Sequence, residues 1–112
     1  MKINLRAAFL GLKFLPHPLG IGGNNLNPKL LLHDNEIEYR NVFTTRKLHF
    51  NAIENVDTFT TFKTNNIIIK PFNSIFTHSF NVKDKEQFKM ALKFLSDKNC
   101  PLTDKALKMI AN

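Results

Sequence analysis

Hydrophobic and polar residues alternate in short runs through the middle of the chain, as in "EIEYR", where Ile37 and Tyr39 stand between charged residues. A period of two predicts β-strands with one face in a core and the other in water. Turn residues separate the runs at intervals of about ten residues, which is typical of an antiparallel sandwich or barrel. We expect strands at residues 29–33, 36–40, 46–50, 55–62, 67–70 and 75–82.

Two of the connections are expected to be tight hairpin turns. Asp34-Asn35 and Asn65-Asn66 separate strand patterns, and Asn and Asp tolerate the positive φ that such turns require. The break in "RKLHFNAIENVD", residues 46–57, is of another kind, because the apolar spacing resets there. We interpret residues 51–55 as a corner between two sheets, with Ile53 pointing into the core.

The pattern becomes helical after residue 83. In "DKEQFKMALKFLS", residues 84–96, four side chains recur at the spacing of one helical face: Phe88, Ala91, Leu92 and Leu95. Asp84 is the expected N-cap, with Gln87 as its partner in a capping box. Met90 and Phe94 form a second apolar row. We therefore expect the helix either to plug a barrel opening or to meet another element with that row.

The two ends of the chain have different patterns from the middle. A short helix is expected after Thr103, with Leu107 and Ile110 as its contacts. Residues 3–15 are strongly apolar and predict a helix or a strand, and we favour burial or self-association over a basic amphipathic helix at a membrane surface. This segment is too short to span a bilayer, and no cleavage site follows it, so we expect it to be retained.

Residues 16–28, "PHPLGIGGNNLNP", are rich in Pro, Gly and Asn, which predicts a linker or an extended arm. The expected organisation is thus an N-terminal arm and linker at 1–28, a domain at 29–96 and a C-terminal short helix at 97–112.

Composition indicates a soluble globular domain. The chain has 112 residues, of which 43% are hydrophobic, and it contains eleven Phe and no Trp. We expect those Phe rings to fill much of the core. The single cysteine, Cys100, excludes an intramolecular disulfide and a multi-Cys zinc site, which is consistent with a reducing, cytoplasmic compartment.

The net charge of +7 favours an acidic partner such as lipid head groups, nucleic acid or an acidic protein. Most of the excess is Lys, which is more often solvated surface than a binding site. The candidates for an anion-binding or lipid-binding role are Lys29, Arg40, Arg46, Lys47, Lys63 and Lys70.

Three stretches together resemble small bacterial pleckstrin-homology-like (PH-like) domains. "RKLHFNAIENVD" is similar to the strand, corner and Ile-x-x-Val element of that family, with Ile53 and Val56 in the matching places. "LLLHDNEIEY" resembles the preceding hairpin, and "FNVKDKEQFKMALKFL" the closing strand and helix. The resemblance covers residues 29–96. It implies a mainly β fold, namely a PH-like antiparallel barrel or two-sheet sandwich of six or seven strands capped by one helix.

The resemblance implies a non-enzymatic binding or assembly module, and some bacterial relatives form rings. Relatives that bind phosphoinositides carry basic residues around the first hairpin, because phosphates need convergent cations. Here that hairpin reads "HDNE", and Asp34 and Glu36 would repel a phosphate. We therefore expect no inositol-phosphate site at this hairpin.

Catalytic and metal motifs are absent from the sequence. His33, His49 and His78 fall on expected strands but have no metal-ligand spacing, and we interpret His78 as a core histidine with a hydrogen-bond partner. Cys100 has no sequence-near base and is expected to be a free thiol. We predict no enzyme activity, no cofactor and no metal.

Three binding classes are left. Nucleic acid is the rival to a membrane or protein partner, since Phe59, Phe62, Lys63, Lys70 and Phe72 could form a stacking platform, although we favour core positions for the Phe rings. Assembly is favoured by the apolar N-terminal segment and the two-row helix. We expect a homo-oligomer or another protein partner, with a cytoplasmic location that could be peripheral to the membrane. The candidate self-association residues are Phe9, Leu12, Met90 and Phe94.

Overall fold

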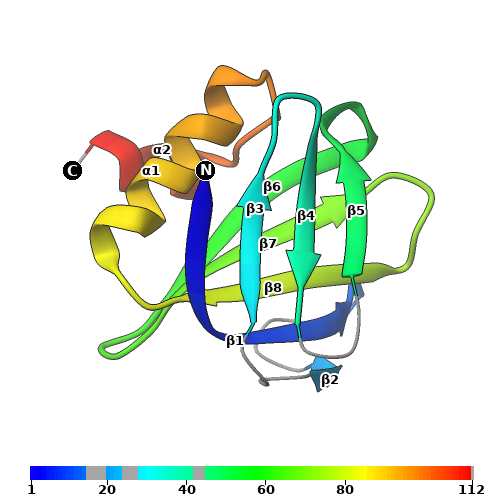
Figure 1. The fold of residues 1–112 in the computed structure, drawn as a ribbon, viewed down its shortest axis with the longest axis horizontal. Coiled ribbons are helices and arrows are strands. Elements are labelled where there is room, and N and C mark those ends of the chain that lie inside the picture. The colour runs from blue at the N-terminus through cyan, green and yellow to red at the C-terminus, as the bar shows by residue number, and fades with distance from the viewer. Residues whose placement is uncertain (15–19, 24–27, 42–44, 112) are drawn as a thin grey trace.

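The fold is a curled antiparallel sheet with two C-terminal helices (Figure 1). A computed structural model of the chain describes residues 1–14, 20–23, 28–41 and 45–111. The strands are β1 (Lys2–Leu12), β2 (Gly20–Gly23), β3 (Lys29–Leu32), β4 (Glu36–Arg40), β5 (Thr45–His49), β6 (Ile53–Thr60), β7 (Asn65–Pro71) and β8 (Phe76–Val82). The turn η1 (Phe50–Ala52) joins β5 to β6, and helices α1 (Lys85–Asp97) and α2 (Asp104–Ala111) follow β8.

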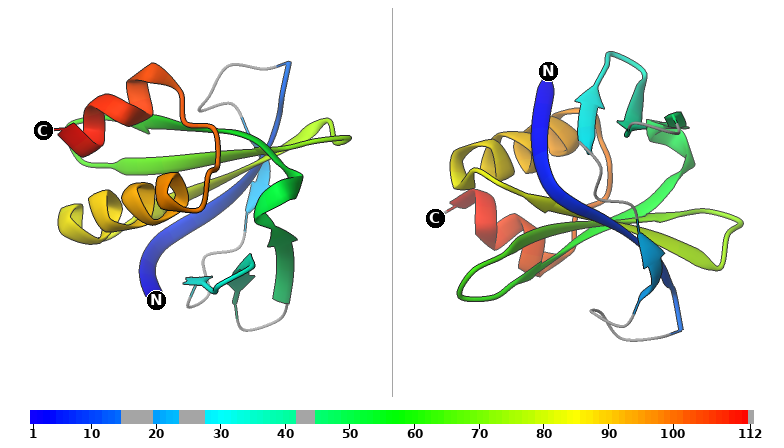
Figure 2. Two further views of the ribbon diagram at one scale, coloured as in Figure 1. Left: turned by 90° about the horizontal axis from the view of Figure 1, so that it is seen from above. Right: turned by 60° about the horizontal axis from the view of Figure 1, so that its bottom comes forward.

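Strand β1 holds the two halves of the sheet together. Its first residues, Lys2 to Asn4, pair with β3, whereas Leu5 to Leu12 pair with β8. The strand order is therefore β5-β4-β3-β1-β8-β7-β6, with β2 pairing beside the second half of β1. In Figures 1 and 2 the strands β3, β4 and β5 cross over β6, β7 and β8, with β1 bending from one group to the other.

This topology confirms the expected mainly β class, a curled antiparallel sheet closed by a helix, and is consistent with the PH-like barrel that the sequence resemblance implies. All pairings between the described strands are antiparallel. Each of the six strands expected between residues 29 and 82 is present, and no strand end is shifted by more than two residues.

The N-terminal segment corrects the expected organisation. Residues 2–12 form a strand at the centre of the sheet, so a domain that began at residue 29 would lack the strand that joins its halves. Ile3 and Leu5 are buried while Lys2, Asn4 and Arg6 are exposed, which is strand periodicity rather than the alternative of a membrane-surface helix. Gly20–Gly23, expected in a linker, adds a short strand to β1; residues 15–19 and 24–27 lie outside the described residues.

The corner between the two halves lies at η1, slightly earlier than the range 51–55. Phe50 is buried, and β6 begins at Ile53, which is 2% exposed. The expectation that Ile53 points into the core is confirmed. The apolar spacing resets here because the 3-10 turn changes the direction of the backbone before the alternation resumes.

Helix α1 covers one opening of the curled sheet. Asp84 Oδ1 accepts hydrogen bonds from the backbone N–H of Glu86 (2.7 Å) and Gln87 (3.4 Å), which confirms the N-cap. The Gln87 side chain does not complete a capping box, because its Oε1 accepts the Asn4 N–H at 3.0 Å instead. This bond ties the first turn of α1 to β1. The buried face is the expected one: Phe88, Ala91, Leu92 and Leu95.

The core is mainly aliphatic, which corrects the expectation of an aromatic core. Among the described Phe residues, Phe50, Phe80 and Phe88 are buried. Five others have exposed side chains: Phe9, Phe14, Phe62, Phe72 and Phe76. The central positions belong to Ile and Leu of β1, β3 and β7, whose branched side chains fill the narrow space between the two halves of the sheet.

The expected hairpin chemistry is also corrected. Among the described residues other than Gly, positive φ occurs at Asn73 (57°) and Asn99 (64°) and not at Asp34-Asn35 or Asn65-Asn66. Asn65 and Asn66 begin β7, and the turn before them is held by Thr61, whose Oγ1 accepts the Thr64 N–H at 3.1 Å. The turn between β6 and β7 is therefore stabilised by a Thr side chain, and not by Asn residues with positive φ as expected.

Candidate functional site

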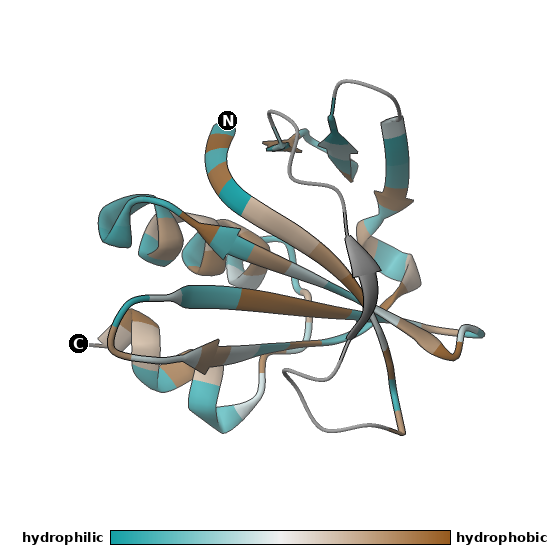
Figure 3. Cartoon of the chain, turned by 90° about the horizontal axis from the view of Figure 1, so that it is seen from below, coloured by the Kyte–Doolittle hydropathy of each residue, from teal (hydrophilic) through white to brown (hydrophobic). Residues whose placement is uncertain are grey.

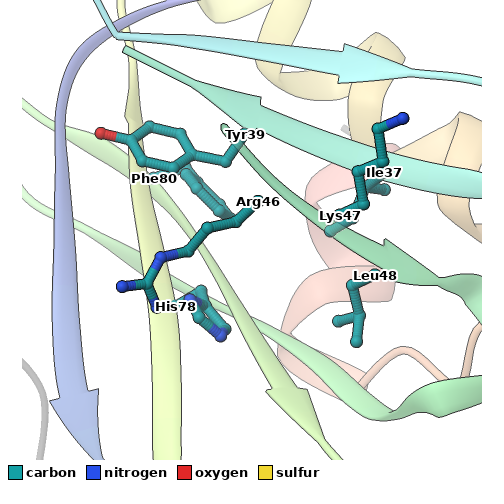
Figure 4. Close-up of a pocket in the computed structure, with 7 residues that line it drawn as sticks. All are labelled: Ile37, Tyr39, Arg46, Lys47, Leu48, His78 and Phe80. Carbon is teal, nitrogen blue, oxygen red and sulfur yellow. The ribbon is translucent and has the colours of Figure 1, made fainter. Parts of the chain in front are cut away.

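A cavity of about 440 Å³ lies between the two halves of the sheet, beside β5, which is an edge strand among the described residues. Its lining residues are Ile37 and Tyr39 on β4, Arg46, Lys47 and Leu48 on β5, and His78 and Phe80 on β8 (Figure 4). This volume falls within the range of about 300–1,000 Å³ that is usual for small-ligand pockets.

Strand alternation explains why these side chains converge. Ile37 and Tyr39 pair with Leu48 and Arg46 across β4 and β5, so all four share the inner face of this half. His78 and Phe80 share the inner face of β8 on the other half. The cavity thus requires both halves, and residues far apart in the sequence meet in it.

The inner wall of the cavity is apolar. Ile37 and Phe80 are buried, and the ring centroids of Tyr39 and Phe80 lie 5.6 Å apart in a tilted arrangement. The Tyr39 hydroxyl accepts a hydrogen bond from Asn41 Nδ2 at 3.0 Å, which holds the ring in place. A ligand in this cavity would therefore contact carbon over most of its inner end.

Three nitrogen-bearing side chains line the cavity: Arg46, Lys47 and His78. Figure 4 shows the side chain of Arg46 extended toward His78. Neither side chain forms a hydrogen bond or ion pair with another described residue. Arg46 therefore has N–H donors free for an anion, and the half-buried His78 lacks the expected hydrogen-bond partner among the described residues.

The pKa of His78 is lowered from its usual value, first by burial and then by the positive charge of Arg46. Both effects disfavour the imidazolium form. His78 is therefore neutral at neutral pH, and its ring can donate one hydrogen bond and accept another. The lining thus places two basic side chains, Arg46 and Lys47, beside a neutral polar ring.

The structure separates the six predicted anion-binding residues. Arg46 and Lys47 reach the cavity. Lys29 and Arg40 are opposite each other on β3 and β4, where repulsion from Lys2 is the largest cause of a lowered Lys29 pKa. Lys63 lies in the turn before β7, and Lys70 lies near the end of β7. The six residues therefore do not form one site.

Arg40 is already committed to an acidic partner. Its Nε donates to Glu38 Oε2 at 3.0 Å, and His33 Nε2 lies 2.9 Å from Glu38 Oε1. Hydrogen bonds from His33 and Arg40 lower the pKa of the Glu38 carboxyl, whose side chain is 5% exposed. Because the Arg40 guanidinium is already paired with the Glu38 carboxylate, this group of residues is a poor candidate for binding an external anion.

The other predicted residues are dispersed. Phe62 and Phe72 are exposed at opposite ends of β7, about 20 Å or more apart at the usual strand rise, so they do not form one stacking platform. Phe94 of the self-association set packs on Phe50 with ring centroids 6.1 Å apart, so η1 is the element that meets the second row of α1. Met90 and Phe9 are exposed, Leu12 is half-buried, and self-association stays a prediction.

Sequence reasoning missed Tyr39, His78 and Phe80 as parts of a binding site. The alternation of polar and apolar residues showed that these side chains lie on an inner face of the sheet. It could not show that a cavity lies beside that face. Among the described residues, no group of three His, Cys, Asp or Glu side chains is placed to hold a metal ion. No helix in the described part of the chain has the length and apolar character needed to cross a membrane.

No protein-family model matches this chain, and a search of curated proteins returns no significant match.

Proposed function

We propose that the protein is a non-enzymatic PH-like binding module whose cavity takes a small amphiphilic anion. The observation that carries this proposal is the pair Arg46 and His78, two uncommitted polar side chains at the opening of an apolar cavity. An apolar ligand body would lie against Phe80 and Ile37. Its anionic group would accept hydrogen bonds from the Arg46 guanidinium.

A binding role is a better match than a catalytic one for the residues in the cavity. The lining residues in the described part of the chain include no Ser, Cys, Asp or Glu, so they do not supply a serine or cysteine nucleophile with a carboxylate beside it. His78 has no carboxylate or hydroxyl partner among the described residues that would orient it as a general base. The cavity instead resembles ligand pockets in general, which combine an apolar interior with a few polar groups at one end.

The test compares three ligands with one hydrocarbon chain and different head groups: octane-1-sulfonate, octanol and octylammonium. Calorimetric titration should give the highest affinity for the sulfonate, lower affinity for the alcohol and the lowest for the cation. Arg46→Gln should weaken sulfonate binding about tenfold, because it removes a charge-assisted hydrogen bond, and should leave octanol binding little changed. Arg6→Gln is the matched control, since Arg6 is exposed on β1 outside the cavity.

The proposal fails if the three ligands bind equally or if none binds. It also fails if Arg46→Gln and Arg6→Gln weaken sulfonate binding to the same extent, because the net charge of the chain would then explain the preference. Backbone amide shifts in Ile37, Leu48 and Phe80 on adding the sulfonate would localise the ligand in the cavity.

A further inference from the structure

The turn between β7 and β8 exposes large apolar side chains to water. Phe72 is 52% exposed, Ile75 is 59% exposed and Phe76 is 36% exposed. We call these three residues the apolar tip. The turn projects beyond the rest of the sheet on the right of Figures 1 and 3, and its ribbon carries hydrophobic colouring in Figure 3. Exposed apolar side chains gathered at one projecting point usually mark an interaction site.

Backbone hydrogen bonds hold the apolar tip in place. The Phe72 N–H donates to the Ala52 carbonyl at 2.9 Å, and the Lys13 N–H donates to the Ile75 carbonyl at 2.8 Å. Asn73 has positive φ, as tight turns require, and Ser74 Oγ accepts the Phe76 N–H at 3.1 Å. The tip is thus a structured turn whose apolar side chains are presented outward, rather than a loop that could fold back over them.

The charges around the apolar tip are suited to an anionic surface. Residues 70–76, "KPFNSIF", contain a lysine and no acid. Lys70 forms no ion pair with a described residue. The Glu54 carboxylate is paired with Lys13 Nζ at 2.9 Å, and Lys13 Nζ also donates to the Pro71 carbonyl. The whole chain carries a net charge of +7.

We propose that the apolar tip inserts among the head groups of an anionic phospholipid bilayer, with Lys70 at the level of the phosphates. A narrow projecting turn can bury its three apolar side chains on all sides only if the partner surface deforms around it. Lipids in a bilayer can rearrange in this way. Lysines beside such a turn add attraction to anionic lipids. This site differs from the cavity in its residues and in its ligand.

Co-sedimentation with vesicles tests the proposal. The full chain should bind vesicles of equal parts phosphatidylglycerol and phosphatidylcholine, and should bind phosphatidylcholine alone much more weakly. The double variant Phe72→Ser/Ile75→Ser should lower the partition coefficient at least about tenfold, because it removes two side chains that would leave water. Lys70→Gln should lower it about fivefold and reduce its salt dependence.

Phe62→Ser is the matched control. Phe62 is 98% exposed in the turn between β6 and β7, at the other end of β7, and has the same side chain as Phe72. Its loss should leave vesicle binding unchanged. Thermal unfolding of each variant should stay close to that of the parent chain, because Phe62, Phe72 and Ile75 are each at least half exposed. An equal loss of binding in Phe62→Ser and in the double variant would overturn the proposal.

A fluorescent reporter separates insertion from adsorption by charge. The chain contains no Trp, so Phe72→Trp and Phe62→Trp each place a single indole in the protein. Phosphatidylglycerol vesicles should shift the emission of Phe72→Trp to the blue and leave that of Phe62→Trp unchanged. Binding without any shift at position 72 would overturn insertion. Arg46→Gln should keep vesicle binding, so failure of the cavity proposal and failure of this one are distinguishable.

Discussion

The Thr103 hydroxyl donates a hydrogen bond to the Asp57 carboxylate at 2.8 Å and also accepts the Ala106 N–H at 3.2 Å. One side chain therefore caps α2 and attaches it to β6. The same segment covers the edge of β6, since the Val56 N–H donates to the Pro101 carbonyl and the Thr103 N–H donates to the Val56 carbonyl. The segment that leads into α2 thus covers the edge of β6 at Val56, where the strand would otherwise be free to pair with another chain.

Thr103→Ala should lower the free energy of unfolding by about 1–3 kcal/mol, because it removes an N-cap and a hydrogen bond to a charged group. Urea unfolding followed by circular dichroism measures the change. Thr60→Ala, at an exposed position of β6, should change stability by less than about 0.5 kcal/mol. Similar losses in the two variants would contradict a specific role for Thr103.

Ile53→Ala should destabilise the chain by about 2–5 kcal/mol, since it opens a cavity at a residue that is 2% exposed. Ile75→Ala makes the same chemical change at a residue that is 59% exposed, and should cost less than about 0.5 kcal/mol. Denaturant titration of the two variants measures the loss in free energy of unfolding at a buried and at an exposed isoleucine. A small loss for Ile53→Ala would mean that the corner at η1 does not direct this side chain into the core.

Stability should fall on acidification because of His78. The pKa of His78 in the folded chain lies below its ordinary value of 6.5, owing first to burial and then to Arg46. Below pH 6.5 the unfolded chain takes up the proton first, so the free energy of unfolding decreases as pH falls toward the folded-state pKa. Above pH 6.5 this contribution is constant. His78→Gln should remove this slope, and His49→Gln, an exposed β5 position, should retain it.

The cavity should bind an anion more tightly as pH falls toward the lowered pKa that His78 has in the folded chain, because protonation of His78 adds a further cation beside Arg46. Octane-1-sulfonate is the suitable ligand, since its head group stays ionised through this range. Calorimetric titrations at several pH values measure the affinity. Affinity that is independent of pH, or equally pH-dependent in His78→Gln, would show that His78 does not face the bound anion.

The Cys100 thiol should be unreactive in the native chain. It is 5% exposed, and burial raises its pKa, so both access and thiolate formation are disfavoured. Ellman's reagent should react at least about 100-fold more slowly with native than with urea-unfolded protein. Comparable rates would indicate that the segment between α1 and α2 opens readily.

Local patterns in the sequence predicted the elements that depend on near neighbours. Alternation at Ile37 and Tyr39 predicted a strand, and the spacing from Phe88 to Leu95 predicted α1 with Asp84 as its cap. These inferences succeeded because strand and helix periodicity record which side of one element faces the core. The Gln87 capping box failed, since a partner distant in sequence, the Asn4 N–H, competes for the same side-chain oxygen.

The sequence by itself determined the six strands between residues 29 and 82, the main helix and the inward direction of Ile53. Only the tertiary structure decided that β1 joins the two halves, that exposed Phe residues outnumber buried ones in the described chain, and that Arg46 meets His78. The physical reason is that periodicity fixes the face of a side chain. Whether that face meets packed atoms, an open cavity or water depends on how far the sheet curls and where its edges stop.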